Sequence, residues 1–306
     1  MPLLTRRTFV ALGAGYVAAA AAARPALAIT MDDVNWKAIP EPYAKTACDR
    51  ILDALRTHGT HAALLAVGQN VDNDQGRAIL DAWNRAGHIL GNHTWTHRSY
   101  GSPAVTTEWF EQDILKDETL LKSWPNYRKL FRFPALKEGA TAERRDTMRR
   151  FLADHGYHNG CVTIDASDWY YSARLQQRLT ADPAFDVQRY REPYLAHLLD
   201  RANYYNGLSM KVLGRSIPHT ILVHYNLINT LFLGDALAMF RKNGWGLISA
   251  EEAFTDPIYQ RQPNTVPAGE SLLWALAQET GKFDRELRYP GEDDVYEKPI
   301  LDRLGL

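Results

Sequence analysis

Short apolar runs alternate along most of the chain with longer segments in which apolar residues recur every three or four positions. The short runs are typical of buried strands, and the longer pattern is typical of helices that cover a sheet. The expected strands are 26–31, 62–67, 88–91, 129–133, 159–164, 219–224 and 246–248. The expected helices are 43–58, 75–86, 106–122, 141–155 and 234–243. Strands that alternate with helices predict an α/β fold built on a parallel sheet or barrel.

Two stretches interrupt this alternation. Residues 171–217 have a helical pattern and predict a helical insertion before the strand 219–224. Residues 263–306 follow the last strand–helix unit as a C-terminal extension, which contains the acidic turn 290–294. Neither stretch has the pattern of an independent domain. We therefore expect one domain over residues 24–262, which includes the insertion, with the extension packed against it.

The first 23 residues have the pattern of an export signal. Arg6 and Arg7 precede an apolar run over residues 9–23, roughly 15 residues long, which is too short to span a bilayer comfortably. A basic start, an apolar middle and small residues at the end are typical of a signal peptide. The segment 5–9, with paired arginines one residue before phenylalanine, resembles the twin-arginine signal. A general secretory signal and an alanine-rich disordered start are the alternatives.

The position of cleavage follows from the first expected strand. The small-x-small sequence at 26–28 fits a cleavage site, but a cut after Ala28 would remove most of the strand 26–31. We therefore expect cleavage within residues 20–23, so that the leader comprises residues 1–23. The mature protein is then expected in the periplasm or outside the cell, delivered by the twin-arginine export machinery and without a stable membrane span.

Charge and cysteine content exclude several kinds of function. The 35 Lys and Arg residues balance 36 Asp and Glu residues, so the chain lacks the basic excess of most nucleic-acid binders. Cys48 and Cys161 are the only cysteines, so a disulfide framework and a four-cysteine zinc site are both excluded. A metal site in this protein must therefore use mainly histidine and carboxylate ligands.

Polar residues that could take part in catalysis or metal binding follow the expected strands at their C-terminal ends. They are Asp32, Asp33, His93, His97, Arg132, Asp165, Asp168 and His224. Taken alone, each has a common structural explanation, such as a helix cap, a salt bridge or a packed core histidine. In a (β/α) barrel, however, the C-terminal ends of the strands meet on one face, where catalytic groups gather. Their shared placement therefore predicts one functional site.

The same residues belong to five motifs, which occur in the order Thr30-Met31-Asp32-Asp33, His93-x-x-x-His97, Arg132-Phe133-Pro134, Asp165-x-x-Asp168-Trp169 and Leu222-Val223-His224. In order and spacing this set resembles the polysaccharide deacetylase family, the NodB-homology carbohydrate esterases. The resemblance covers residues 26–256 and implies a distorted (β/α) barrel. This chain departs from the family pattern at Met31, usually Phe, and at Val34 and Leu136, both usually Gly.

The resemblance implies a metal centre. Asp33, His93 and His97 would bind one divalent cation, with zinc expected and cobalt or nickel as alternatives, because nitrogen and oxygen ligands accept all three ions. Two imidazoles and one carboxylate leave positions for water and substrate, as a catalytic site requires.

The resemblance also implies an acid and a base. Asp32 would be the general base that deprotonates water, held ionised and oriented by Arg132. His224 would be the general acid that protonates the leaving group. Asp165 would pair with His224 and favour its protonated form, in preference to Asp168.

Three further residues are expected to contact the substrate: Trp169, Pro134 and Leu222. A buried core position is the equal alternative for Trp169. The substrate implied by the resemblance is an acetylated polysaccharide or oligosaccharide, such as chitin oligomers, peptidoglycan, an exopolysaccharide or xylan. Hydrolysis of its N-acetyl or O-acetyl groups would release acetate.

Two other functions remain open at this point. The same fold could carry a metal-dependent hydrolase of a non-sugar amide, or a catalytically inactive carbohydrate-binding homologue. A metalloprotease is disfavoured because the His-Glu-x-x-His pattern is absent from the sequence.

Overall fold

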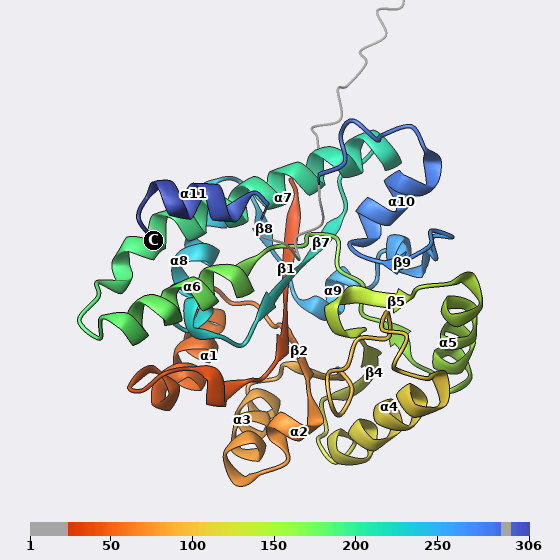
Figure 1. Cartoon of the computed structure of the whole chain (residues 1–306), viewed down its shortest axis with the longest axis horizontal. Coiled ribbons are helices and arrows are strands. Elements are labelled where there is room, and N and C mark those ends of the chain that lie inside the picture. The colour runs from red at the N-terminus through yellow and green to blue at the C-terminus, as the bar shows by residue number, and fades with distance from the viewer. Residues whose placement is uncertain (1–23, 289–294) are drawn as a thin grey trace, which may run out of the picture.

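A parallel sheet that curls into a half-barrel forms the centre of the computed structural model, which describes residues 24–288 and 295–306 (Figure 1). The expected export leader and the acidic turn 290–294 lie outside the described residues. The strand order is β6-β4-β3-β2-β1-β7, with β8 paired to β1. The strands are β1 (Ala26–Asp33), β2 (Ala63–Ala66), β3 (Ile89–Asn92), β4 (Tyr127–Phe131), β6 (His158–Asn159), β7 (Pro218–His224) and β8 (Gly246–Leu247). The expected α/β class and barrel type are thus confirmed.

Strand β1 is central because both of its edges are paired. One edge pairs with β7 along nearly its whole length, from Ala26 with Pro218 to Asp32 with His224. The other edge pairs first with β8 and then with β2, up to Asp33 with Ala66. All of these pairings are parallel, so the C-terminal ends of β1, β2 and β7 meet at one edge of the sheet.

The expected strand 159–164 is only partly correct. His158 and Asn159 pair with β4, whereas Ile164 makes an isolated parallel bridge to Ile221 of β7. Strands β4 and β7 lie at opposite sides of the sheet, so one straight strand cannot pair with both of them. The residues between Asn159 and Ile164 therefore cross from one edge of the sheet to the other. This crossing brings the two edges of the sheet together without closing a regular barrel.

The expected helices lie on the outside of the sheet and, apart from the start of α8, within a few residues of their expected bounds. They are α1 (Ala47–Thr57), preceded by the 3-10 turn η2 (Tyr43–Thr46), and α3 (Asp74–Arg85), α4 (Thr107–Leu121), α5 (Ala142–Asp154) and α8 (Leu227–Lys242). Helix α8 begins earlier than the sequence indicated, because the side chain of Asn226 accepts the backbone N–H of Asn229 (3.1 Å) and caps the helix there. Short elements between the expected ones are α2 (Gly68–Val71), α9 (Ala250–Ala253), η1 (Trp36–Ala38), η3 (Pro134–Leu136) and η5 (Pro257–Gln260).

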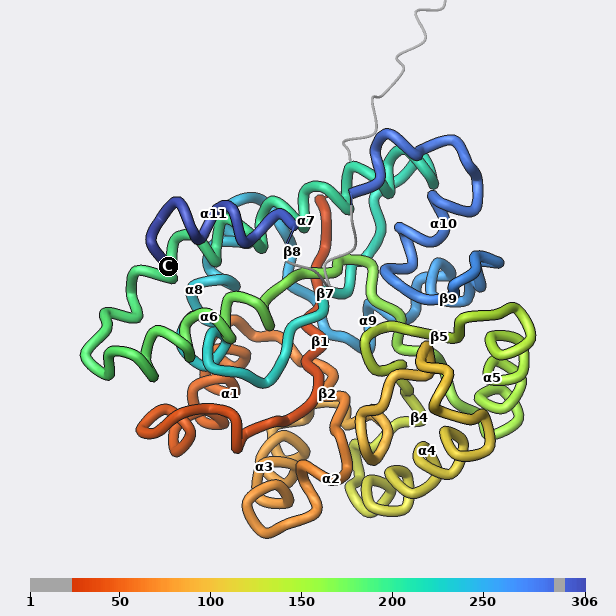
Figure 2. Tube along the Cα trace, in the orientation of Figure 1, coloured from red at the N-terminus to blue at the C-terminus, as the bar shows by residue number. Residues whose placement is uncertain are grey.

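The insertion is helical, as expected, and packs with the C-terminal extension. It comprises α6 (Asp168–Ala181), η4 (Val187–Tyr190) and α7 (Arg191–Leu213). The extension contains α10 (Leu272–Thr280), α11 (Glu297–Arg303) and the strand β9 (Ala268–Gly269), which pairs with β5 (Lys137–Gly139). Figures 1 and 2 show α7 running across one side of the molecule with α10 and α11 beside it. Within the described ranges, none of the helices has the length and apolar character needed to cross a membrane.

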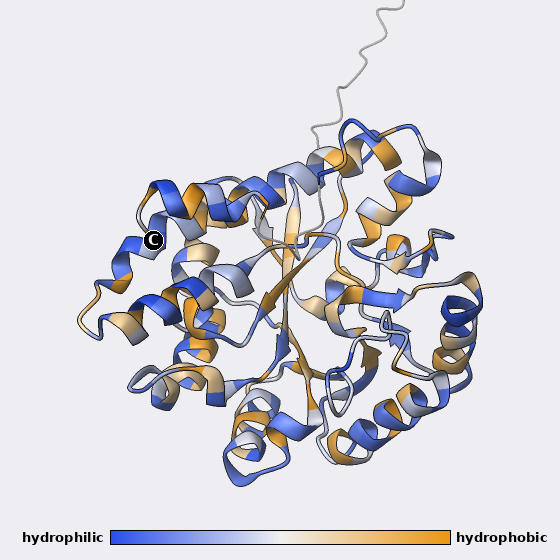
Figure 3. Ribbon diagram, in the orientation of Figure 1, coloured by the Kyte–Doolittle hydropathy of each residue, from blue (hydrophilic) through white to orange (hydrophobic). Residues whose placement is uncertain are grey.

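Side chains of β1 alternate between two environments. Leu27, Ile29 and Met31 belong to the large apolar core that the outer helices cover. Thr30 and Asp32, between them in sequence, are buried polar residues that face the interior of the half-barrel. Figure 3 shows the hydrophobic colouring of the central strands against the mixed colouring of the surrounding helices. One face of the strand therefore packs in the core, and the other places polar side chains in the interior of the half-barrel.

A substitution in the large core tests this arrangement. Leu64 of β2 is fully buried in that core, so Leu64→Ala should lower the free energy of unfolding by about 2–5 kcal/mol. Leu304→Ala is the matched control, since Leu304 is 47% exposed and its loss should change stability by no more than about 0.5 kcal/mol. Chemical denaturation followed by circular dichroism measures both values. Equal losses for the two variants would contradict the assigned core.

Candidate active site

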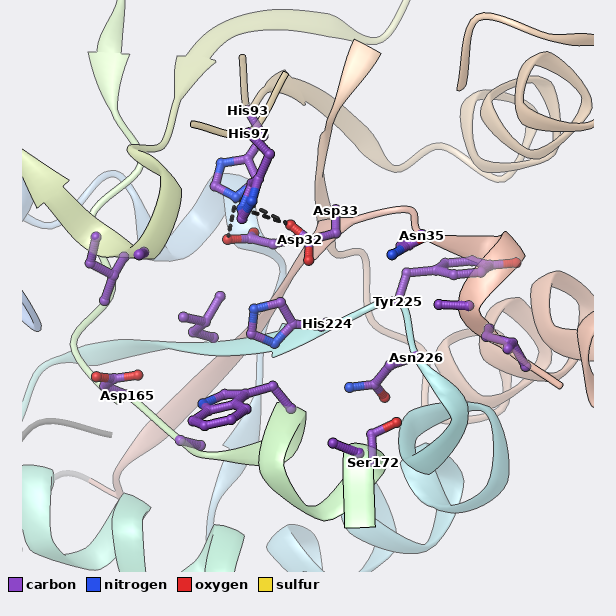
Figure 4. Close-up of a pocket in the computed structure, with 18 of the residues that line it drawn as sticks. Asp32, Asp33, Asn35, His93, His97, Asp165, Ser172, His224, Tyr225 and Asn226 are labelled. Atoms are coloured by element: carbon purple, nitrogen blue, oxygen red, sulfur yellow. Dashed lines mark ion pairs between the residues drawn. The ribbon is translucent and has the colours of Figure 1, made fainter. Parts of the chain in front are cut away.

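A cavity of about 510 Å³ opens where the C-terminal ends of the strands meet. Asp32 and Asp33 reach it from the end of β1, His93 and His97 from the loop after β3, and His224 from the end of β7. Figure 4 shows the two histidines above the aspartate pair, with His224 on the opposite side of the opening. The structure thus brings together residues that are up to about 190 positions apart in sequence.

Asp33, His93 and His97 form a cluster that fits one metal ion. Their ligand atoms all lie within 4.8 Å of one another. Asp33 Oδ1 is 3.1 Å from His97 Nε2 and 3.5 Å from His93 Nε2. This buried oxygen makes no hydrogen bond among the described residues. His93 donates its Nδ1–H to the carbonyl of Arg132 (2.9 Å), so its Nε2 lone pair faces the carboxylate.

A cation between these atoms would relieve the repulsion of lone pairs that face one another. Burial disfavours the charged form of His97, but the adjacent carboxylate of Asp33 outweighs it and raises the pKa of His97. Without metal, His97 therefore holds a proton more tightly than a free imidazole does. Metal binding would displace that proton. The donor set, two imidazole nitrogens and one carboxylate oxygen, suits a divalent transition metal ion.

Helix α4 holds the loop that carries both histidines. Asp113 of α4 accepts hydrogen bonds from the backbone N–H and the hydroxyl of Thr96, both at 3.0 Å. Asn92, at the end of β3, accepts the N–H of Thr94 (2.9 Å) and donates to the carbonyl of Ile114 on α4 (2.9 Å). These bonds hold the loop in a tight turn, which places the two imidazoles four residues apart on one side.

Asp32 is held by a buried arginine. Arg132 Nη1 lies 2.5 Å from Asp32 Oδ1, and both side chains are almost fully buried. The remaining donors of Arg132 bond to the hydroxyl of Thr30 (2.9 Å) and the carbonyl of Gly160 (2.8 Å). The other oxygen of Asp32 lies 3.5 Å from His93 Nε2 and so faces the metal cluster. The expected contact between Arg132 and Asp32 is present.

The carboxylate that pairs with His224 is Asp168, so the expectation that Asp165 would do this is wrong. Asp168 Oδ1 lies 2.7 Å from His224 Nδ1, and its Oδ2 accepts the backbone N–H of His224 and the amides of Asn226 and Asn229, each at 2.8 Å. Asp165 lines the same cavity away from this group (Figure 4). Asp168 is the first residue of α6 and is turned toward the end of β7, a choice that the Asp-x-x-Asp spacing does not determine.

The Asp168 pairing keeps His224 protonated. Burial alone would lower the pKa of this imidazole, but the charge of Asp168 and its hydrogen bond raise that pKa to about 10. The more distant charges of Asp33 and Asp32 act in the same direction. His224 is therefore a cation at neutral pH, on the side of the cavity opposite His97.

The residues expected to contact substrate have different positions. Trp169 lines the cavity and is 37% exposed, which excludes the alternative of a core tryptophan. Leu222 also lines the cavity. Pro134 is buried and is not among the residues that line the cavity, so its expected contact with substrate stays a prediction. Ala135 and Leu136, both at positive φ (53° and 56°), turn the chain so that they line the cavity instead.

Several lining residues had no signal in the motifs. Asn35, Ser172, Gln176 and Asn226 contribute polar groups to the cavity. Of these, only Asn226 could have been found from sequence, as the cap of a helix. Val34 and Leu136, where the family pattern has glycine, both adopt positive φ (53° and 56°). The glycine-type backbone is thus retained with bulkier residues, at a cost of about 1–3 kcal/mol each.

Comparisons with known proteins agree with the motifs. Residues 19–160 match the family model described as polysaccharide deacetylase, a range that includes Asp32, Asp33, His93, His97 and Arg132 but ends before Asp168 and His224. None of the curated proteins matches the chain.

Solved structures share the fold at low sequence identity. The Bc1960 peptidoglycan N-acetylglucosamine deacetylase is 19% identical, with a TM-score of 0.50 over 76% of this chain and 89% of that chain. A mutant of a pseudoenzyme from carbohydrate esterase family 4, with restored enzymatic activity, is 17% identical, with a TM-score of 0.50 over 76% and 68%. Peptidoglycan deacetylase PdaC from Bacillus subtilis is 20% identical, with a TM-score of 0.48 over 76% and 93%. The half-barrel thus shares the fold of a structure from carbohydrate esterase family 4, at a TM-score of 0.50.

The Asp168–His224 pairing gives a testable difference between two aspartates. Asp168→Asn removes the largest of the charges that keep His224 protonated, so in the metal-free protein the pKa of His224 should fall well below its value of about 10. NMR titration of the His224 imidazole measures this shift. Asp165→Asn is the matched control and should leave the titration close to that of the wild type. A fall in the pKa of His224 in Asp165→Asn alone would show that Asp165 is the partner of His224.

Proposed function

Because residues 19–160 belong to the polysaccharide deacetylase family, we propose that this chain is a metal-dependent deacetylase that hydrolyses N-acetyl or O-acetyl groups of a glycan and releases acetate. One observation carries the proposal. The cation-binding cluster, a carboxylate held by arginine and a protonated histidine held by aspartate all border a single cavity. Together these groups can supply the three things that hydrolysis of an acetamide uses: polarisation of the carbonyl, a proton acceptor and a proton donor.

The chemistry divides between the two sides of the cavity. A divalent cation held by Asp33, His93 and His97 would polarise the acetyl carbonyl and make a nearby water more acidic. The oxygen of that water would bond to the carbonyl carbon while Asp32 accepts the proton of the water. Arg132 keeps the carboxylate of Asp32 in position. When the carbon–nitrogen or carbon–oxygen bond then breaks, protonated His224 gives its proton to the leaving atom. The products are acetate and a free amino or hydroxyl group on the sugar.

The lining of the cavity supports a sugar with an acetyl group. Trp169 and Leu222 offer apolar surface, which suits the acetyl methyl and the face of a sugar ring. Asn35, Ser172 and Asn226 offer amide and hydroxyl groups, which suit the hydroxyls of a sugar. Acetylated chitin oligomers, peptidoglycan, an exopolysaccharide and acetylated xylan all fit this description. Among structures with this fold, one is of a peptidoglycan N-acetylglucosamine deacetylase.

Acetate release from a panel of acetylated glycans, with and without chelator, tests the reaction. We expect release from at least one glycan, loss of activity with the chelator, and recovery with zinc, cobalt or nickel. Elemental analysis of the purified protein identifies the native ion. Small cyclic amides form a separate arm of the assay. No release from any glycan while metal is bound, together with turnover of a cyclic amide, would replace the proposal with a non-sugar amidase.

Two substitutions separate the base from the metal ligands. Asp32→Asn should lower kcat by about 10²–10⁴-fold while metal content stays unchanged, because the amide cannot accept the proton of water and all three metal ligands remain. His93→Ala should lose both metal and activity, because it removes a ligand. Kinetics and elemental analysis on the same preparations measure both quantities. If Asp32→Asn kept most of the activity, Asp32 would not be the general base. If the wild type itself were inactive, the protein would be an inactive homologue.

We also propose that the protein is exported to the periplasm or beyond with the paired arginines Arg6 and Arg7 as part of a twin-arginine signal. The pairing of Ala26–Ala28 with Pro218–Thr220 supports cleavage before residue 24, since a cut after Ala28 would remove three paired residues from β1. Mass spectrometry of the exported protein should find a mature N-terminus between residues 21 and 24. Lysine at both arginine positions should leave the precursor inside the cell. A mature N-terminus at Ile29 would contradict the expected cleavage position.

A further inference from the structure

The first turn of α6 carries Asp168, which pairs with His224, and Trp169, which lines the cavity, and the residue before it bonds to a histidine of another helix. The backbone N–H of Ser167, the residue before Asp168, donates to Nε2 of His197 on α7 (3.0 Å). Ser167 and Asp168 are both fully buried. The carbonyl of Ser167 in turn accepts the N–H of Tyr170 (3.0 Å), so this residue begins the helix. A bond at Ser167 therefore fixes where α6 starts.

The imidazole of His197 has one defined tautomer. Because Nε2 accepts a hydrogen bond, the proton of the neutral ring is on Nδ1. Burial, followed by the charges of Arg201 and Arg288, lowers the pKa of His197 to about 3, so the ring is neutral at physiological pH. The ring of Tyr171 packs against it, with centroids 5.0 Å apart. The imidazole is thus held as an acceptor for Ser167.

A buried ion pair fixes the other side of this ring. His197 Nδ1 lies 3.5 Å from Oε1 of Glu297, the first residue of α11. Arg201, one turn further along α7, bonds to the same oxygen at 2.9 Å, and both charged side chains are almost fully buried. Loss of one partner in such a pair leaves an unpaired buried charge. The ion pair therefore keeps Glu297, and with it the orientation of His197, in place.

Helix α11 contacts α6 at a second point. Arg174 of α6 bonds to Asp302 (2.8 Å) and to the carbonyl of Leu306 at the end of the chain. The same guanidinium donates to the hydroxyl of Tyr170 (3.1 Å). The C-terminal residues are thus joined to α6 directly at Arg174 and through His197 at its start.

We infer that His197 is a positioning residue, which acts through Ser167 to hold Asp168 at the correct distance and angle for His224. The inference rests on the proposed function for its catalytic consequence. His197 does not line the cavity and contacts no reacting atom. Its loss would let the start of α6 shift, which lengthens the 2.7 Å contact between Asp168 and His224 and impairs proton donation to the leaving group.

The test compares two substitutions at one position. His197→Leu removes the acceptor at similar volume, whereas His197→Gln supplies an amide oxygen at the place of Nε2. On an acetylated glycan, His197→Leu should lower kcat by about 10–100-fold with little change in KM, because only the acid step is impaired. On 4-nitrophenyl acetate, whose leaving group departs without a proton, kcat should stay within about twofold of the wild type. His197→Gln should restore glycan turnover.

His219→Leu is the matched control. His219 is also a buried neutral histidine, with its pKa lowered to about 3 by burial, but it lies near the start of β7 and bonds to Thr163. Its substitution should affect stability as much as His197→Leu does and leave the ratio of glycan to ester turnover unchanged. Hydrogen exchange gives a readout that does not need activity. The peptide 165–171 should exchange faster in His197→Leu than in the wild type, His197→Gln or His219→Leu.

The possible results lead to different conclusions. Selective loss of glycan turnover with faster exchange in peptide 165–171, both reversed by glutamine, supports the positioning role. Wild-type exchange in His197→Leu, or an equal loss on both substrates in the leucine variants of His197 and His219, overturns it. If the wild type turns over no acetylated glycan, the proposed function fails, and the exchange data alone still decide whether His197 holds the start of α6.

Discussion

The contacts of Arg132 connect four strands and organise the interior of the half-barrel. Its guanidinium bonds to Asp32 and Thr30 of β1 and to the carbonyl of Gly160 beyond β6. Its own backbone follows β4, donates to Asn92 of β3 and accepts the Nδ1–H of His93. Removing one partner from a buried pair of this kind costs about 3–5 kcal/mol, because the other charge stays buried without compensation. Asp32 and His93, the proposed base and one proposed metal ligand, are therefore oriented by the same residue.

The negative charges of Asp32 and Asp33 and the positive charge of His224 lie on different sides of the cavity. Asp32 and Asp33 are adjacent on β1, yet one is held by a permanent cation and the other faces two imidazoles. Neighbouring residues of a strand point to opposite sides, and the positive φ of Asp33 (79°) alters that alternation at the strand end. Across the opening, Asp168 keeps His224 protonated. In the proposed reaction, the first side of the cavity would accept a proton and the second would donate one.

The helices outside the common half-barrel also shape the cavity. Trp169, Ser172 and Gln176 all come from α6 and form one wall. On the opposite side, the carbonyl of Leu136 accepts the N–H of Glu270 from the extension, next to the pairing of β5 with β9. The insertion and the extension therefore determine the shape of the cavity around a conventional set of reacting groups.

The order of strands and helices followed from hydrophobic periodicity. Apolar residues at a given spacing lie on one buried face only if the segment adopts the secondary structure with that period. The same sequence signals placed Asp33, His93, His97, Asp32, Arg132 and His224 around one site, since parallel strands end on the same edge. The partner of His224, the broken strand 159–164 and the position of Pro134 could not be found in this way. Each depends on how a turn packs against elements distant in sequence. Asp168 rather than Asp165 meets His224 because tertiary contacts fix the start of α6, and local spacing carries no information about which side of a turn faces another strand.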